Sequence, residues 1–161
     1  MDSSNTPQPL WDFALIFYAQ PQVAETCLYL QDQHQANVCL LIGLYWLDMQ
    51  GRALSSADLV DLTDHTRKWT QTIIKPLREM RRTLKQPFEN YAQDNLQEQL
   101  RSSIKQAELL AEKKLLMEIE RWFAKISVAS NTQGQNLLEY LKILRLDEIV
   151  IDSLLKKIAL Q

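Results

Sequence analysis

The stretch SSADLVDLTDHTRKWTQTIIKPLREMRRTLK, residues 55–85, decides the fold class. Positions suited to a buried face recur in it every three or four residues, and at about 100° per residue they share one arc of roughly 80°. These positions are Leu59, Leu62, Thr66, Trp69, Ile73, Leu77, Met80 and Leu84. Because the phase does not slip at Pro76, we expect one long helix over about residues 56–85. It should bend at Pro76, since proline has no N–H to donate to the carbonyl of Thr72.

Helical patterns continue on both sides of this stretch. A second long one covers about residues 90–127, and shorter ones cover about 10–19, 21–33, 38–47, 136–146 and 148–159, with a loop near 130–136. Only 3 glycines occur in 161 residues, and tight β-turns consume glycine. The sequence therefore predicts an all-α protein, a helical bundle of about six or seven helices. We expect residues 10–161 to form a single helical domain after a disordered lead-in, residues 1–9.

Individual residues place some of the helix ends. Asn37 is suited to cap the helix that follows it, and Ser55 with Asp58 forms a capping pair at the start of the long helix. Gly51 is suited to the left-handed residue after a helix. The run from residue 38 to 47 is apolar on all sides, which predicts a central helix. Gly43 within it costs about 1 kcal/mol of helix propensity, so we expect another helix to approach closely there.

The bulk composition limits the class of protein. The formal net charge is −2, 46% of residues are hydrophobic and 24% are charged, values typical of a soluble globular protein. The N-terminal residues do not form a secretory signal, and the longest apolar run, ten residues, is too short to cross a bilayer. Cys27 and Cys39 both lie among apolar neighbours, which favours a reduced, buried pair over a functional disulfide. We therefore expect a cytoplasmic protein without a membrane partner.

Charge is concentrated in one segment. Residues 67–85 carry seven Lys or Arg and one Glu, a net of +6, so the remaining chain has a net of −8. The predicted wheel turns this basic face toward water, and Arg78, Arg81, Arg82 and Lys85 form an i, i+3, i+4, i+7 patch. Three interpretations are open: a solvated or internally paired face, a docking surface for an acidic protein, or a surface for RNA or the ribosome. No aromatic residue lies beside the patch to stack on bases.

Three other groups of residues are candidates for chemistry. A polar cluster of Gln31, Asp32, His34 and Asn37 lies between two apolar helices, where it either caps helix ends or binds a small ligand. Asp58, Asp61 and His65 share one side of the long helix, where they either complement its dipole or ligate a metal. Six early aromatic residues either pack in the core or line an apolar pocket: Trp11, Phe13, Phe17, Tyr18, Tyr45 and Trp46.

Motifs of known enzymes are absent from the sequence. Gly-x-Ser-x-Gly, Cys-x-x-Cys, His-Glu-x-x-His and a phosphate-binding glycine loop do not occur. We therefore predict that the protein binds no metal and no cofactor. The absence of these motifs favours a non-enzymatic module over an enzyme.

A set of short motifs over about residues 10–85 resembles a family of small proteobacterial proteins with no assigned biochemical role. The matching pieces are Leu-Trp-x-Phe-Ala, Tyr-x-x-Pro, Cys-Leu-x-Leu-Gln-Asp and Pro-Leu-Arg followed by Arg-Arg. The resemblance marks Trp11, Phe13, Tyr18, Pro21, Gln31, Asp32, Trp46, Pro76, Arg78 and Arg82 as family-type positions. The chain departs from the pattern at Gln22, where the family resembles glycine, and over residues 35–39, where an acidic and an amide group are missing. The resemblance implies no activity, and these departures weaken a catalytic interpretation of the Asp32 cluster.

The leading hypothesis from the sequence is an interaction module that docks a protein partner. The docking surface would be the basic face of the 56–85 helix, with Arg78, Arg82 and Lys85 as steering and anchoring groups, or an apolar groove between the bundle and the C-terminal helices. RNA or ribosome association through the same face is one alternative. A small-ligand or enzyme site at Asp32 and His34 is another. Oligomeric state is open.

Overall fold

The structure, a computed structural model, describes residues 6–126, 129–130 and 135–159. Its helices and strands follow one another along the chain as α1 Leu10–Tyr18, α2 Pro21–His34, α3 Val38–Met49, β1 Arg52–Ala53, α4 Ser56–Trp69, a π-helical turn Thr70–Ile74, α5 Lys75–Thr83, α6 Leu96–Lys125, β2 Ala129–Ser130, α7 Asn136–Ile143 and α8 Glu148–Ala159. With α4, the π-turn and α5 counted as one rod, these residues form seven helices, which confirms the all-α bundle. Among the described residues, no helix is both long and apolar enough to span a membrane.

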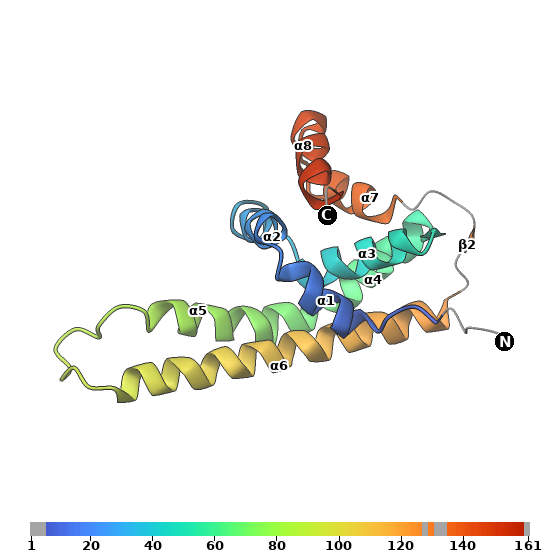
Figure 1. Cartoon of the computed structure of the whole chain (residues 1–161). Coiled ribbons are helices and arrows are strands. Elements are labelled where there is room, and N and C mark those ends of the chain that lie inside the picture. The colour runs from blue at the N-terminus through green and yellow to red at the C-terminus, as the bar shows by residue number, and fades with distance from the viewer. Residues whose placement is uncertain (1–5, 127–128, 131–134, 160–161) are drawn as a thin grey trace.

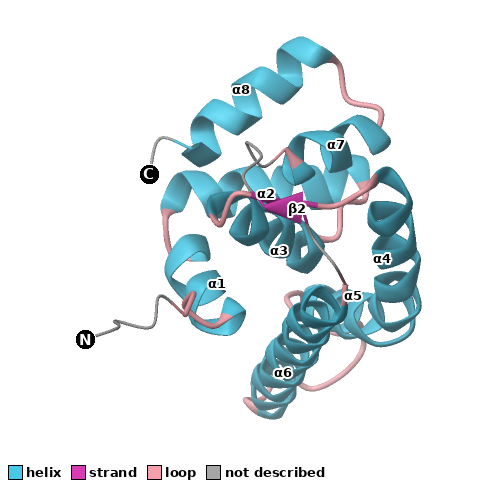
Figure 2. Cartoon of the chain, turned by 90° about the vertical axis from the view of Figure 1, so that its right-hand side faces the viewer, coloured by secondary structure: helices cyan, strands magenta, loops and turns pink. Residues whose placement is uncertain are grey.

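Helix α3 lies at the centre of the bundle. Helices α1, α6 and α7 pack against it, and Figure 2 shows α7 and α8 on the side of the bundle away from α6. Eight of its residues are buried, as the apolar run from residue 38 to 47 predicts. A Cβ placed on Gly43 would come within 2.8 Å of the side chain of Ile119 in α6. The expected close approach at this glycine is therefore confirmed.

The long rod from Ser56 to Thr83 is continuous but is not α-helical throughout. At Thr70–Ile74 it widens into a π-turn, in which the Lys75 N–H donates to the carbonyl of Thr70, five residues earlier. Pro76 follows immediately and has no N–H to donate. The sequence predicts a bend at this missing donor, and in the structure the wider turn accommodates it. The rod thereby passes from α4, inside the bundle, to α5, which runs out of it beside α6 (Figure 1).

Two expected boundaries differ from those observed. The second long helix begins at Leu96 rather than near residue 90, because Asn90 has a positive φ of 64° and the Asp94 carboxylate accepts from the N–H of Leu96. A two-residue antiparallel pair, β1 with β2, is not expected from the sequence. The predicted lead-in and the 130–136 loop fall partly on residues 1–5 and 131–134, which lie outside the described residues.

The expected capping residues are found at their helix ends. Asn37 Oδ1 accepts from the N–H of Leu40 at 3.2 Å, and Ser55 Oγ accepts from the N–H of Asp58 at 3.0 Å. Gly51, after α3, has a φ of 65°, which its lack of a side chain permits. These three predictions are confirmed.

The C-terminal helices are tied to the centre through polar groups. The Asp48 carboxylate accepts from the backbone N–H groups of Asn136 and Leu137 at 2.8 and 3.0 Å, so it caps α7 from α3. The Tyr140 hydroxyl accepts from the N–H of Asn37 at 2.9 Å. The Asn37 side chain also donates to Thr70 Oγ1 in the π-turn. Asn37 thus connects three segments that are distant in sequence.

Candidate functional site

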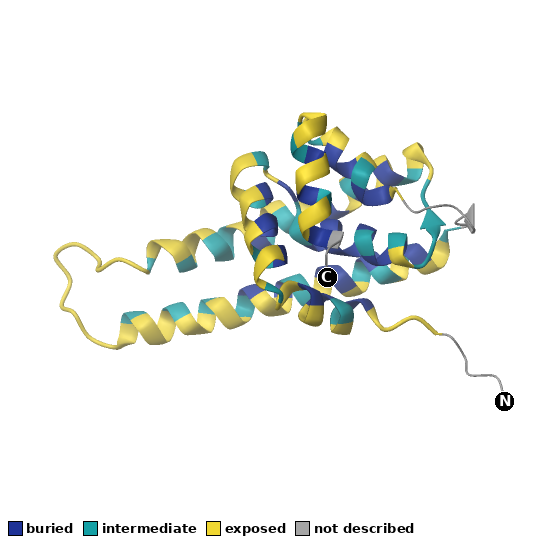
Figure 3. Ribbon diagram, turned by 45° about the horizontal axis from the view of Figure 1, so that its top comes forward, coloured by how far each residue is buried: buried dark blue, intermediate teal, exposed yellow. Residues whose placement is uncertain are grey.

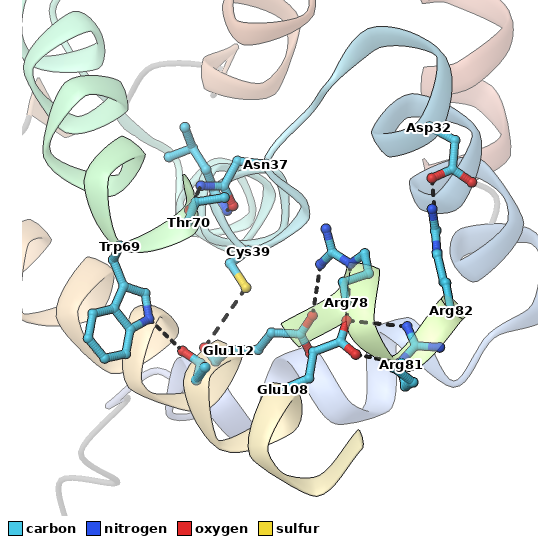
Figure 4. A network of polar contacts seen from close by, with 12 residues as sticks. Asp32, Asn37, Cys39, Trp69, Thr70, Arg78, Arg81, Arg82, Glu108 and Glu112 are labelled. Atoms are coloured by element: carbon cyan, nitrogen blue, oxygen red, sulfur yellow. Dashed lines mark hydrogen bonds and ion pairs between the residues drawn. The ribbon is translucent and has the colours of Figure 1, made fainter. Parts of the chain in front are cut away.

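The arginines of α5 meet two glutamates of α6 at the root of the α5–α6 hairpin. Arg78 donates to Glu108 at 3.0 Å and to Glu112 at 3.2 Å, and Arg81 donates to both carboxylate oxygens of Glu108. Arg82 pairs with Asp32 at the end of α2, at 2.9 Å. Figure 4 shows Arg78 and Arg81 of α5 joined to Glu108 and Glu112 of α6 in one network, with the Arg82–Asp32 pair beside it.

The ion pairs of Glu108 with Arg78 and Arg81 are largely buried, which makes them energetically important. The side chains of Arg78 and Arg81 are 15% and 19% exposed and that of Glu108 is 7% exposed. Burial opposes ionisation of Glu108, but the hydrogen bonds and charges of Arg81 and Arg78 outweigh it and hold its pKa below the ordinary value. Burial, reinforced by the neighbouring Glu108 charge, raises the pKa of Glu112. One charge-assisted carboxylate therefore holds both arginines in place.

The expectation that the basic face lies in water is wrong for Arg78 and Arg81. Both side chains turn inward to α6, because Glu108 and Glu112 lie one turn apart on the facing helix and need partners where they are buried. Arg82 is 44% exposed and paired with Asp32, and Lys85 is exposed. Of the three interpretations of the basic stretch, the internally paired face describes its inner half.

Arg78, Arg81, Glu108 and Glu112 also line a cavity of about 630 Å³, which we call the α6 groove. Its walls come from α1, α2, α3, α5 and α6. Most of the lining is apolar, including Trp11, Ala14, Leu15, Tyr18, Leu28, Ile42, Leu109 and Leu116. The polar lining includes Arg78, Arg81, Lys105, Glu108 and Glu112. Concave sites of this size, with mostly apolar walls and a few polar groups, are typical of binding sites.

Large apolar side chains are exposed along the rim of the groove. Leu15 is 49% exposed, Leu28 42% and Leu109 50%, and the Tyr18 ring is 37% exposed. Trp11 lies under the ammonium group of Lys113, 5.1 Å from the ring centroid. Burial, followed by the charges of Cys27 and Glu112, raises the pKa of the Tyr18 phenol, so it stays a neutral hydrogen-bonding group.

The predicted polar cluster assembles only in part. Gln31, Asp32 and Asn37 line a second, more polar cavity of about 490 Å³ between α2, the long rod and α7. His34 is not part of that lining, and its ring lies edge-on against Tyr29. Asn37 and Asp32 both have partners within the chain. Asn37 therefore caps a helix, as one interpretation expects, whereas Asp32 forms an ion pair with Arg82.

The remaining candidates have structural contacts or lie apart. Asp58 bonds to the hydroxyl of Ser55, while Asp61 and His65 are exposed. The described part of the chain contains no group of three or more His, Cys, Asp or Glu residues suited to holding a metal ion.

Both cysteines are free and buried, as predicted. Burial raises the pKa of the Cys27 thiol to about 12, and it also raises the pKa of Cys39. Neither is therefore a thiolate near neutral pH.

The six early aromatic residues divide between the two interpretations. Phe17 and Trp46 are buried, and Phe13, Phe17 and Tyr45 stack on one another. Trp11 and Tyr18 line the α6 groove.

Sequence reasoning missed Glu108, although a signal was present. At about 100° per residue, Leu115 and Ile119 each lie roughly 20° from Glu108 on the helical wheel of α6. Glu108 therefore occupies the middle of the arc that α6 buries, and it is 6% exposed. A carboxylate at the centre of an apolar arc indicates a cationic partner on the facing helix.

The fold and its groove define a helical-bundle protein with a projecting two-helix hairpin and an apolar groove at the root of that hairpin. The chain belongs to a family described as protein of unknown function (DUF2390), whose pattern matches residues 9–119. This match confirms the resemblance to an uncharacterised family. It includes α1 to α5, most of α6 and every residue that lines the α6 groove. No curated protein and no solved structure matches the chain.

Proposed function

We propose that this protein is a non-enzymatic, cytoplasmic interaction module whose α6 groove receives an amphipathic helix of a partner protein. The observation that carries the proposal is the groove itself, an apolar channel with exposed leucines and a tyrosine on its rim. Exposed apolar surface of this kind, bordered by polar residues, marks interaction sites in soluble proteins.

The length of the groove fits a helix. Its lining on α6 extends from Ser102 to Leu116, fourteen steps of about 1.5 Å, or roughly 21 Å. That is about four turns of a partner helix. Such a helix would place apolar side chains at positions i, i+3 or i+4, and i+7 against Leu15, Leu28 and Leu109.

The charged residues of the groove indicate which charge the polar end of the partner helix should carry. Arg78, Arg81 and Lys105 outnumber Glu108 and Glu112 by one positive charge. Lys105 makes no ion pair with the described part of the chain, and Ser102 and Gln106 lie beside it in the lining. A partner helix with Asp or Glu at the end that meets Lys105 would be complementary. In this proposal Arg78 and Arg81 shape the wall of the groove.

Binding of RNA through the basic face has less support than this proposal. Two of the four arginines and lysines of the patch, Arg78 and Arg81, are neutralised by glutamates within the chain. The acidic partners of such arginines would compete with phosphate groups.

A peptide display experiment tests the proposal. Peptides selected from fragments of the source genome should carry the apolar spacing given above, gain helicity on binding, and shift NMR signals of groove residues. They should lose binding to Leu109→Glu and keep it to Ile149→Glu, a matched change at a side chain 85% exposed on α8. If no peptide is selected, or if the selected peptides bind both variants equally, the groove is not the docking site.

A further inference from the structure

The part of the α5–α6 hairpin that extends beyond the bundle has no core of its own. We call residues 79–108 the distal hairpin. Helix α5 has no buried residue, and α6 has none before Glu108. Figure 1 shows the two helices running away from the bundle, and Figure 3 shows their outer parts in the colours of exposed and intermediate residues. Helices gain most of their stability from packing an apolar face, so the apolar side chains of the distal hairpin remain available for packing.

Five large apolar side chains of the distal hairpin are about half exposed or more. They are Met80 at 47%, Phe88 at 51%, Tyr91 at 72%, Leu96 at 65% and Leu100 at 53%. Phe88 and Tyr91 also pack edge to face at the turn, with ring centroids 5.2 Å apart. Single exposed apolar residues are ordinary in proteins, but a group of them in one projecting element marks an interaction surface.

We propose that the distal hairpin pairs with the distal hairpin of a second copy of this chain, giving a four-helix arrangement with two-fold symmetry. None of the five exposed apolar side chains that carry this proposal lines the α6 groove, so it does not depend on a partner helix in that groove. A two-fold interface brings the same surface of both copies together, and two antiparallel helix pairs are the standard components of a four-helix bundle.

Charge balance supports a second copy as the occupant. The distal hairpin contains five Lys or Arg and five Asp or Glu residues, so two copies do not repel one another through a net charge. The signs are also separated along it. Arg82, which also pairs with Asp32, lies at the end of α5, and Lys85 follows just after it. Glu89 and Asp94 lie in the turn, and Glu98, which also pairs with Arg101, lies at the start of α6. A two-fold axis between two hairpins can place the positive segment of each opposite the negative segment of the other.

The available area is sufficient for a weak to moderate dimer. Aromatic side chains present about 150–250 Å² each, and Leu and Met present somewhat less, so at these exposed fractions the five side chains contribute at most on the order of 500 Å² per copy. Two copies together then bury up to about 1,000 Å² of apolar surface, which reaches the lower bound for a specific interface before polar atoms are counted.

Sedimentation equilibrium of the full chain tests the proposal. We expect a monomer–dimer equilibrium as the concentration rises to about 100 μM. Leu96→Glu combined with Leu100→Glu should weaken association at least 30-fold or so, since two charges would enter an apolar contact. Circular dichroism of the variant should be unchanged, because neither side chain is buried in the monomer.

Two further variants locate the contact. Ile149→Glu, on α8, and Leu109→Glu, on the rim of the α6 groove, should dimerise like the natural chain. The proposal is overturned by a monomer at all concentrations, or by a dimer that the double variant leaves intact. Loss of dimer in Leu109→Glu alone would also overturn it, because that result would place the contact at the groove.

Discussion

Replacing Glu108 with Gln should destabilise the protein far more than its single charge suggests. Glu108 accepts hydrogen bonds from both Arg78 and Arg81, and all three side chains are less than 20% exposed. Removing one member of a buried ion pair costs about 3–5 kcal/mol, because the remaining charge stays buried without a partner. Arg78 keeps Glu112 and Gln keeps one acceptor oxygen, so we place the loss near the lower end, at about 3 kcal/mol.

Thermal unfolding followed by circular dichroism measures this loss. For a chain of this length about 1 kcal/mol corresponds to 2–4 °C, so Tm should fall by roughly 6–12 °C. Glu139→Gln is the matched control. It removes the same group from an exposed pair with Lys142, in which both side chains are 50% exposed, and it should change stability by less than about 1 kcal/mol. Equal melting temperatures for the two variants would refute the idea that Glu108 holds the arginines.

The lowered pKa of the Glu108 carboxyl group predicts that the stability of the fold decreases at acidic pH. The folded-state pKa of Glu108 is lower than its ordinary value of 4.5. Its contribution to stability is therefore complete above about pH 4.5 and is lost as the pH falls through the lower, folded-state pKa. Urea midpoints measured between neutral and acidic pH should decline less steeply below that point in Glu108→Gln than in the natural chain. Parallel curves would show that another group controls acid unfolding.

Three further outcomes follow from the packing and burial of the bundle. Gly43→Ala should lower the free energy of unfolding by about 1–3 kcal/mol, because the new methyl group would overlap a branched side chain of α6. This loss should outweigh the better helix propensity of alanine, and a rise in Tm would contradict it. Asp48→Ala should cost about 2–3 kcal/mol and loosen α7, measured as faster amide exchange at Asn136, because the first N–H groups of α7 lose their acceptor. Cys27 and Cys39 should react with a thiol reagent at pH 8 only after denaturant is added, since both thiols are buried with raised pKa values; rapid labelling of the folded chain would disprove their burial.

Local sequence rules predict the helices well because they act within one turn. Asn37 caps α3 through its own side chain, and the apolar residues of the Ser56–Thr83 rod share one face whatever lies opposite. Gly43 also indicates a tertiary contact, because the helix propensity that a glycine loses inside an apolar helix can be offset by close packing of a second helix. Such features depend on neighbours within a few residues, so one sequence suffices to predict them.

The groove and its charged floor depend on which helices face each other, and local rules do not contain that information. The wheel of residues 56–85 places Met80 on the buried face and the arginines outside it, but Met80 is 47% exposed and α6 covers Arg78 and Arg81. The wheel of α6 places Glu108 within its apolar arc, which indicates a cationic partner for this carboxylate but does not show which helix supplies that partner. The π-turn before Pro76 is expected only as a bend, since proline removes a donor without specifying how the turn adjusts.

The attachment of α7 has a consequence for the whole family. The matched segment ends at residue 119, yet two polar groups within it, the N–H of Asn37 and the carboxylate of Asp48, find their partners beyond it. A relative that ended after α6 would have to satisfy those groups with water or with another chain, and to cover the side of α3 on which α7 rests here. In such a relative we expect a different residue at the position of Asp48, whose carboxylate would otherwise lose the backbone N–H groups that it binds here.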